Sequence, residues 1–234
     1  MKISYINKEL VKEFLPVRVQ KSNKGTYGNV LNIAGSSSYP GAAFLSSVSA
    51  LRVGAGYVML ATTSSNIPIV ASNTPDVTFL DLGESATGTV PRDSLKFIQG
   101  VANPHCYSVG CGLSVTKDSK EFLISFLNKY AKSQTPIIID ADGINILAQA
   151  NKVHLPLNSI ITPHPLELAR LMKTDVEEVQ ADRVKWAWKT SEKYDCIVLL
   201  KGHETVIAVP NGQVFVNKSG NSALSKAPLQ DLDF

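Results

Sequence analysis

Two aspartates follow a short apolar run in the middle of the chain. Pro136-Ile137-Ile138-Ile139 leads into Asp140, and Asp142 comes two residues later. A carboxylate at the end of a buried strand is costly unless it is paired, hydrated or close to a metal ion. We therefore interpret Asp140 as a functional residue. Asp142 is equally suited to cap the helix predicted after it, and we interpret it as partly structural.

A histidine stands between two prolines further along the chain. Pro163 and Pro165 hold the backbone around His164 in extended conformations, because a proline restricts both its own φ and the residue before it. This framing presents the imidazole instead of burying it, and it favours a ligand contact. The alternative is a surface turn in which Thr162 or His164 caps the next helix.

A lysine with small and polar neighbours lies between two later apolar runs. The segment reads Lys201-Gly202-His203-Glu204-Thr205. A cation beside a glycine suits the phosphate or ribose of a nucleotide, since the ligand can approach the backbone closely there. The alternative is a hairpin with a solvated lysine, which is usual for a single lysine.

Two segments of small residues also follow apolar runs. One is Ala34–Ala43, and the other is Gly110-Cys111-Gly112. Ligands of open α/β sheets bind beyond the carboxyl ends of the strands, where loops meet helix N-termini. Two glycines around one residue can form a nest of N–H groups for an anion. Each segment taken by itself is also compatible with a tight turn, and such a turn is the commoner case for the second.

The elements that position these residues alternate between strands and helices. Continuous apolar runs are typical of parallel strands buried on both faces. We expect strands at Val30–Ala34, Tyr57–Ala61, Val77–Leu80, Tyr107–Val109, Pro136–Asp140, Ser159–Thr162 and Cys196–Leu200. We expect helices at Gly41–Val53, Lys117–Lys132, Asp142–Gln149, Pro165–Met172 and Val179–Tyr194.

This alternation predicts an α/β fold with a central, mostly parallel sheet and helices on both faces. The rhythm changes near the end, where Thr205–Val209 and Gln213–Val216 follow the strand at Cys196–Leu200 closely, with a Pro-Asn-Gly turn between the last two. Such spacing predicts antiparallel strands. No repeat or linker interrupts the pattern, so we expect a single domain over residues 1–234.

Composition excludes several classes of protein. The net charge of +3 comes from scattered residues with no basic stripe, so we expect no nucleic-acid partner. No apolar stretch approaches the ~20 residues that cross a bilayer, and the N-terminus lacks the apolar core of a signal peptide. The three cysteines are widely separated and have no metal-ligand spacing, which fits free thiols in a reducing compartment. We expect a cytoplasmic protein without a membrane partner.

In this order and at these strand ends, the motifs closely resemble the ATP- or ADP-dependent NAD(P)H-hydrate dehydratase family of the ribokinase-like superfamily. The matching segments are Lys24–Gly28, Gly35–Ala43, Leu51–Gly56, Gly110–Leu113, Asp140–Asn145, Thr162–Glu167, Lys201–Thr205 and Asn221–Leu224. The resemblance therefore covers Lys24 to Ala227. Small departures are Cys111 where proline is common, Gly143 where alanine is common and Leu166 where glycine is common, and we expect little effect from them.

The resemblance implies a reaction that restores damaged dinucleotides. A phosphoryl group passes from ATP or ADP to the ring hydroxyl of hydrated NADH or NADPH, and phosphate is then eliminated, a task of positioning and charge stabilisation. By the same resemblance Ala43, Gly112 and His164 contact the hydrate, with Asp140 and Asn145 beside them, and Lys201, Gly202, His203, Glu204 and Thr205 hold the nucleotide. Asp140 or a neighbour would help to organise Mg²⁺. We assign no residue as a metal ligand in its own right.

One departure from the family is serious. After a segment like Asn221–Ala227 the family continues with Gly-Thr-Gly-Asp and then helices, whereas here Pro228-Leu229-Gln230-Asp231-Leu232-Asp233-Phe234 follows. The glycines would cradle phosphate and the aspartate is the expected catalytic base. Neither Asp231 nor Asp233 has flanking glycines, so the catalytic residue stays unassigned. We expect a C-terminally truncated domain without its covering helices, with poor turnover and a tendency to self-associate.

Two other functions remain open at this stage. One is a ribokinase-like kinase for a small vitamin precursor, which shares the architecture, although the Thr-Pro-His-Pro and Lys-Gly-His-Glu-Thr runs favour the dehydratase. The other is a catalytically impaired relative that binds nucleotides without turnover. A stable phosphorylated product would identify the kinase, and binding without product would identify the impaired relative.

Overall fold

The computed structural model describes residues 2–101, 104–150 and 153–221. Its strands are β1 (Lys2–Tyr5), β2 (Asn29–Ile33), β3 (Tyr57–Thr62), β4 (Thr78–Asp81), β5 (Cys106–Val109), β6 (Ile137–Ile139), β7 (Ser159–Ile161), β8 (Ile197–Leu200), β9 (Thr205–Ala208) and β10 (Gln213–Asn217). Its α-helices are α1 (Lys8–Phe14), α2 (Pro40–Arg52), α3 (Asn66–Ala71), α4 (Leu95–Ile98), α5 (Lys117–Lys129), α6 (Asp142–Gln149), α7 (Pro165–Met172), α8 (Val176–Ala181) and α9 (Arg183–Tyr194). A short 3₁₀ turn, Lys24–Tyr27, precedes β2.

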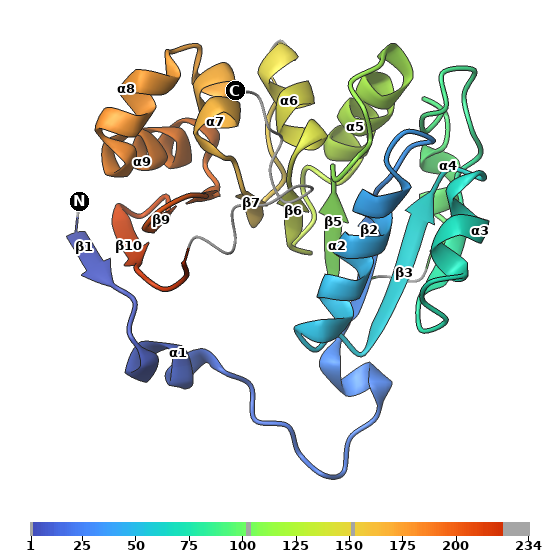
Figure 1. The fold of residues 1–234 in the computed structure, drawn as a ribbon, viewed down its shortest axis with the longest axis horizontal. Coiled ribbons are helices and arrows are strands. Elements are labelled where there is room, and N and C mark those ends of the chain that lie inside the picture. The colour runs from blue at the N-terminus through green and yellow to red at the C-terminus, as the bar shows by residue number, and fades with distance from the viewer. Residues whose placement is uncertain (1, 102–103, 151–152, 222–234) are drawn as a thin grey trace.

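Within the described residues these strands form one sheet, in the order β1-β10-β9-β8-β7-β6-β5-β2-β3-β4 (Figure 1). The pairs from β8 through β7, β6, β5, β2 and β3 to β4 are all parallel. β9 runs antiparallel to both β8 and β10. The predicted α/β class, the mostly parallel sheet and the antiparallel strands near the C-terminus are therefore confirmed.

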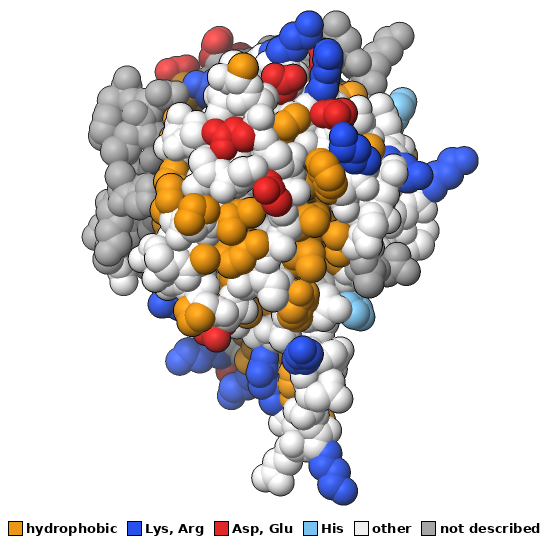
Figure 2. Space-filling view, turned by 90° about the vertical axis from the view of Figure 1, so that its right-hand side faces the viewer, with side chains coloured by type: hydrophobic (Ala, Val, Ile, Leu, Met, Phe, Trp, Pro, Cys, Tyr) orange, Lys and Arg blue, Asp and Glu red, His pale blue; other side chains and the backbone are white. Residues whose placement is uncertain are grey.

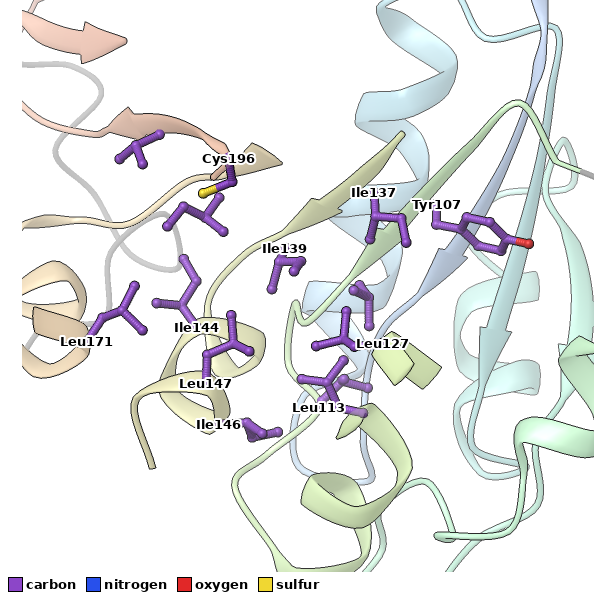
Figure 3. Close-up of a cluster of buried hydrophobic side chains, with 14 of the residues drawn as sticks. Tyr107, Leu113, Leu127, Ile137, Ile139, Ile144, Ile146, Leu147, Leu171 and Cys196 are labelled. Carbon is purple, nitrogen blue, oxygen red and sulfur yellow. The ribbon is translucent and has the colours of Figure 1, made fainter. Parts of the chain in front are cut away.

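Each face of this sheet packs against its own apolar core. On one face α2 and α3 cover a small cluster that includes Ala43, Leu60 and Val70. On the other face α5, α6, α7 and α9 cover a larger cluster. Figure 3 shows part of that cluster, with Ile137 and Ile139 of β6 and with Ile144 and Leu147 of α6 among its side chains. Because neighbouring residues of a strand point to opposite faces, strands buried on both sides must be apolar throughout.

The long helix predicted at Val179–Tyr194 is in fact two helices. Asp182 separates α8 from α9 with φ −148° and ψ 75°, which lies outside the helical region. Its side chain accepts a hydrogen bond from the Lys185 N–H at 3.0 Å and so caps α9. The sequence prediction ran through this position because the apolar period continues across it, whereas an aspartate capping the next helix favours a break.

Several short elements were missed by the sequence prediction. α3 and α4 have 6 and 4 residues, too few for a helical period to be visible. β1 and α1 at the N-terminus contain no buried residue, so no apolar pattern marks them. β1 joins the sheet through a parallel pairing with β10, a partner more than 200 residues away.

No helix in the described part of the chain is both long enough and apolar enough to cross a membrane.

Candidate functional site

The predicted site residues meet at the carboxyl ends of the parallel strands. Because β8, β7, β6, β5 and β2 are adjacent and parallel, the loops that follow them lie at the same end. Hydrogen bonds link successive loops: the Lys201 N–H donates to Pro163 O at 2.8 Å, and the Gly35 N–H donates to Cys111 O at 2.8 Å. Residues from five segments of the chain thus line a single row (Figure 1).

The centre of this row is an ion pair between β8 and β6. Lys201 Nζ lies 2.7 Å from Asp140 Oδ1, and a second carboxylate, Glu167 Oε2, lies 4.0 Å from the same nitrogen. Burial is the largest single influence and lowers the pKa of Lys201, but the negative charges around it, Asp140 first and then Glu167, together outweigh burial, so the net shift is upward. The lysine is therefore a fixed cation, and the interpretation of Asp140 as a residue paired at a buried strand end agrees with its geometry.

The second oxygen of Asp140 has a weaker neighbour. Its Oδ2 lies 3.8 Å from Cys111 Sγ. Burial, and then the negative charge of Asp140, raise the pKa of Cys111 to about 12. The thiol therefore stays protonated at neutral pH. A thiol is a weak donor, so Asp140 Oδ2 keeps capacity to accept a stronger ligand.

His164 begins helix α7 and takes part in its capping. The Glu167 N–H donates to His164 Nδ1 at 3.3 Å, and the His164 N–H donates to Glu167 Oε2 at 2.8 Å, a reciprocal capping box with Pro165 at the first helical position. The side chain of His164 is only 22% exposed. The expectation that the imidazole is presented and not buried is therefore only partly right, because the capping role draws it toward the helix.

Glu167 joins the two halves of the row. Its side chain is 1% exposed. Its Oε2 accepts the capping hydrogen bond from the His164 N–H and also lies 4.0 Å from Lys201 Nζ. A buried carboxylate is stable only when it is hydrogen-bonded and near a cation, and both conditions hold here. In the sequence Glu167 is the last residue of the Thr162–Glu167 motif, and no role was predicted for it. The signal that could have found it is the spacing of three residues from His164, which is the spacing of a capping box.

Glycines bring the loop after β5 close to its neighbours. Gly112 has φ +66°, and a Cβ added there would lie 2.7 Å from the Cβ atoms of Ala42 and Tyr39 at the start of α2. Gly110 has φ +128° and packs against Asp140 O. The loop therefore needs glycine both for its backbone conformation and for its approach to α2.

Ala43 lies in the first turns of α2 with its side chain fully buried. A ligand at this position would meet the backbone and not the methyl group. α2 begins at Pro40, so the N–H groups of Gly41 and Ala42 belong to the orphan donors of a helix N-terminus, and the side chain of Ala42 lies beside Gly112.

The sequence suggested Asp142 as a cap for α6, but Asp142 is not its N-cap. Ala141 occupies the cap position with φ 49°, and Asp142 is the first helical residue. Asp142 Oδ2 instead accepts a hydrogen bond from the Ser114 N–H at 2.8 Å and holds the loop after β5. Asn145, one turn later, accepts from Arg170 Nη1 at 3.2 Å, so its amide is oriented by α7.

The Lys201–Thr205 loop is shaped by an arginine from α9. Arg183 donates to three backbone carbonyls: Nη1 to His203 O at 2.6 Å, and Nη2 to Leu200 O at 3.0 Å and Lys201 O at 2.9 Å. Gly202 has φ +132°, and a Cβ there would lie 2.8 Å from Arg183 Nη1. Nothing in the sequence indicated Arg183, because it stands 17 or more residues before the loop that it holds.

Residues of the same loop complete its conformation. Glu204 has φ 53° and pairs with Lys218 Nζ at 3.4 Å. Thr205 Oγ1 donates to Gly202 O at 3.0 Å. The alternative of a plain hairpin is right about the topology, since β8 and β9 are antiparallel neighbours, but Lys201 is held at Asp140 and is not simply solvated.

This arrangement can bind anions and orient a hydroxyl compound. It offers a protonated lysine, backbone N–H groups at a helix start and beside glycines, and carboxylates fixed by hydrogen bonds. No group of three or more His, Cys, Asp or Glu side chains among the described residues could hold a metal ion by itself. Mg²⁺ with a nucleotide needs only one or two carboxylates, water and phosphate, and Asp140 Oδ2 fits that requirement.

Comparison with known proteins identifies the family. The model of the family described as NAD(P)H-hydrate dehydratase matches residues 30–230. The chain belongs to the NAD(P)H-hydrate dehydratase family. The resemblance seen in the motifs is thereby confirmed. All the strand-end loops described above fall within the matched residues.

Curated members of the family are similar over most of this chain. A bifunctional NAD(P)H-hydrate repair enzyme of Moorella thermoacetica is 35% identical over 223 residues, which cover 93% of this chain and 41% of that protein. The ADP-dependent (S)-NAD(P)H-hydrate dehydratase of Neisseria meningitidis is 33% identical, with 92% of this chain and 69% of that protein covered. The chain thus spans about two fifths of the length of the bifunctional enzymes.

Solved structures agree with this family assignment. The ADP/ATP-dependent NAD(P)H-hydrate dehydratase of Bacillus subtilis, co-crystallised with ATP and Mg²⁺, superposes with a TM-score of 0.81 at 30% identity, over 97% of this chain and 76% of that chain. A ribokinase-like superfamily protein of Enterococcus faecalis, 23% identical, gives a TM-score of 0.82 over 96% of this chain and 75% of that chain. The ribokinase-like fold is therefore confirmed.

The roles expected of individual site residues stay predictions for this member of the NAD(P)H-hydrate dehydratase family. The structure brings Asp140, His164, Gly112 and Lys201 into one row, with Asn145 one helical turn behind. The sequence departs from the family at Pro228–Phe234, where Gly-Thr-Gly-Asp was expected. This segment lies outside the described residues.

Proposed function

We propose that this chain acts on (S)-NADH-hydrate and (S)-NADPH-hydrate and uses ATP or ADP to restore NADH and NADPH. In this reaction the ring hydroxyl of the hydrate accepts the terminal phosphoryl group of the nucleotide. This transfer leaves ADP or AMP, and elimination of phosphate with loss of a ring proton then re-forms the ring double bond. Family membership over residues 30–230 and the names of the relatives support this assignment.

The observation that carries the proposal is the Lys201–Asp140 pair, with Glu167 behind it. It stands between the loops expected to hold the two substrates. In the strand order the Gly112 loop lies on one side of the pair, the rest of the Lys201–Thr205 loop lies on the other, and His164 follows β7 between them. A fixed cation at the junction suits the phosphoryl group that must pass from one substrate to the other, because its charge is stabilised throughout the transfer.

Roles follow from these positions. Ala43 through its backbone, Gly112 and His164 contact the hydrate, with Asp140 and Asn145 orienting it. Lys201 binds phosphate, while Gly202, His203, Glu204 and Thr205 surround the remainder of the nucleotide. Asp140 Oδ2 would hold the Mg²⁺ that accompanies the nucleotide, and the ion would neutralise phosphate charge there. The catalytic base is left unassigned.

The proposal is tested with hydrated NADH and either ATP or ADP in the presence of Mg²⁺. Absorbance at the NADH band and released phosphate are followed together. We expect both to rise in equal amounts. A small-molecule kinase would instead give a stable phosphorylated product without NADH. Binding of hydrate and nucleotide by calorimetry without either product would identify a relative that binds without turnover, and both results contradict the proposed activity.

A further inference from the structure

Two loops that are expected to contact the hydrate lie side by side, and we call them the hydrate loops. One is residues 35–43, which follow β2, and the other is residues 110–114, which follow β5. β2 and β5 are parallel neighbours, so both loops leave the sheet at the same end. The contacts that fix the separation of these loops therefore also set the shape of this part of the site.

Two hydrogen bonds join the hydrate loops. The Gly35 N–H donates to Cys111 O at 2.8 Å, and Ser36 Oγ lies 2.9 Å from Ser114 Oγ. Gly112 stands between these two ties in the chain. A Cβ on Gly112 would lie 2.7 Å from the nearest atoms at the start of α2. The two ties therefore hold Gly112 closely against the other hydrate loop.

Ser114 is bonded through its backbone as well as its hydroxyl. Its N–H donates to Asp142 Oδ2 at 2.8 Å, and its carbonyl accepts from Ser119 Oγ at 2.6 Å. Its φ of 61° lies in the left-handed region, which residues other than glycine rarely adopt. Such residues persist where their surroundings fix them, and they cluster at ligand-binding sites. Ser114 thus joins α5, α6 and the other hydrate loop at one point.

The bond between Ser36 and Ser114 depends on serine at both positions. Ser36 is 1% exposed, and Ser114 is the one hydrogen-bond partner that its hydroxyl has among the described residues. A buried hydroxyl that loses its partner costs free energy. Glycine would suit the backbone at position 114 better, but it could not make this bond.

The connection between β4 and α4 supports the hydrate loops from outside. The Ser37 N–H donates to Gly88 O at 2.8 Å, and Thr89 Oγ1 lies 3.0 Å from Thr116 Oγ1, two residues after Ser114. This connection belongs to the side of the molecule that faces the viewer in Figure 2, where hydrophobic side chains gather. The hydrate loops themselves are held by polar contacts.

We propose that Ser114 is a positioning residue for hydrated NADH and NADPH, which sets the separation of the hydrate loops through its hydroxyl bond to Ser36. The identity of the ligand rests on the function proposed above. The nucleotide should not be affected, because the Lys201–Thr205 loop follows β8, which β7 and β6 separate from β5 in the sheet.

The first experiment is a double-mutant cycle of Ser36→Ala, Ser114→Ala and the variant with both changes, made in the 234-residue chain. Calorimetry measures the dissociation constants for hydrated NADH and, separately, for ATP with Mg²⁺. We expect each single variant to bind hydrated NADH about three- to tenfold less tightly, the effect of one lost hydrogen bond, with ATP binding unchanged. Both changes break the same bond, so the double variant should bind hydrated NADH no more weakly than Ser114→Ala.

Asn158→Ala is the matched control. Asn158 also has a left-handed backbone, with φ 59°, and its side chain donates one hydrogen bond, to Gln134 O at 2.9 Å. It lies just before β7, at the opposite end of the strands from the hydrate loops. The control should lose stability in urea unfolding but should bind hydrated NADH like the unmodified chain.

The second experiment needs no ligand. Cys111 lies within the second hydrate loop, and its half-buried thiol reacts with iodoacetamide when the loop opens. Peptide mass spectrometry follows the alkylation of each cysteine. We expect Cys111 to react about three- to tenfold faster in Ser114→Ala than in the unmodified chain, because one bond that closes the loop is lost. Cys196, which is buried far along the chain, should react at an unchanged rate.

Unchanged affinity for hydrated NADH in Ser114→Ala would overturn the proposal. So would additive effects in the cycle, or equal weakening of ATP and hydrate binding, because Ser114 would then support the fold and not the loop pair. If the unmodified chain binds no hydrated NADH, the proposed function fails. In that case an unchanged rate at Cys111 would overturn the role of Ser114 as well, whereas a faster rate would support its hold on the loops.

Discussion

At the scale of single residues, the chemistry depends on Lys201 being a cation in a fixed place. Asp140 and Glu167 raise its pKa against the effect of burial, so the lysine is charged throughout the physiological pH range. A phosphate placed at Lys201 would compete with Asp140 Oδ1 for the same ammonium group. The ion pair therefore holds the lysine in position until a nucleotide binds.

Removal of this charge should weaken nucleotide binding. We expect Lys201→Ala to raise the dissociation constant for ATP or ADP by about 10- to 100-fold, since one hydrogen bond to a charged group contributes about 1.5–3 kcal/mol. Isothermal titration calorimetry measures the change. The control is Lys96→Ala, whose lysine pairs with Asp93 on the surface. The unfolding midpoint, recorded alongside, separates lost binding from a lost fold, and unchanged affinity in a folded variant would remove Lys201 from the site.

Gly112 offers a second prediction, with a control in the same chain. Both Gly112 and Gly212 have positive φ, but only at Gly112 would a Cβ meet other atoms within 4 Å. Gly212→Ala should therefore lower the free energy of unfolding by only ~1–2 kcal/mol, the cost of a left-handed backbone conformation. We expect Gly112→Ala to lose more in urea unfolding and also to bind the hydrate less tightly. Equal losses of stability in the two variants would show that the approach of this loop to α2 is not tight.

At the scale of elements, α9 acts on the site through one side chain. Arg183 gathers three carbonyls of the β8–β9 connection and so sets the path of the loop expected to hold the nucleotide. It lies behind the loop and is a positioning residue. Burial lowers the pKa of the guanidinium, although Glu204 opposes this effect, and an arginine still remains charged.

Loss of Arg183 should change nucleotide binding selectively. We expect Arg183→Ala to raise the dissociation constant for ATP about tenfold, which corresponds to ~1.4 kcal/mol, with the affinity for hydrated NADH unchanged. Arg183→Lys should recover part of the loss, because one ammonium can reach fewer carbonyls than a guanidinium. Lys185→Ala on the exposed side of α9 serves as the control. If both ligands weaken equally, Arg183 supports the fold and not the loop.

At the scale of the whole molecule, the row of loops is assembled by the order of the strands. Sheet neighbours β8, β7, β6, β5 and β2 come from segments that span most of the chain. Any change that displaces one strand would therefore disturb both halves of the site. The single-domain prediction for residues 1–234 remains a prediction.

Turnover is the prediction that belongs to this scale. Residues 228–231 read Pro-Leu-Gln-Asp where the family resemblance leads us to expect Gly-Thr-Gly-Asp. General-base catalysis contributes about 10²–10⁴-fold, and an anion-binding donor about 10²–10³-fold. We therefore expect the 234-residue chain to release phosphate slowly. The comparison is a chain in which residues 228–234 are replaced by Gly-Thr-Gly-Asp and the helices that follow it in the family. Equal rates for the two chains would show that the base lies elsewhere.

The sequence by itself determined the fold class, the parallel core strands and the loops that carry the site. These features were predictable because a strand covered on both faces must be apolar throughout, and because the polar residues of an open α/β sheet gather where such strands end. Helix boundaries at α6 and α7 were also predicted to the residue. The family motifs added the expected roles.

Only the tertiary structure decided which of these residues touch. Lys201 and Asp140 are 61 residues apart in the chain, and their contact at 2.7 Å depends on β7 separating β8 from β6 in the sheet. Arg183 and the pairing of β1 with β10 left no local signal, because their partners are distant in sequence. Local patterns report burial and chain direction, whereas strand order and long-range contacts depend on the packing of the whole sheet.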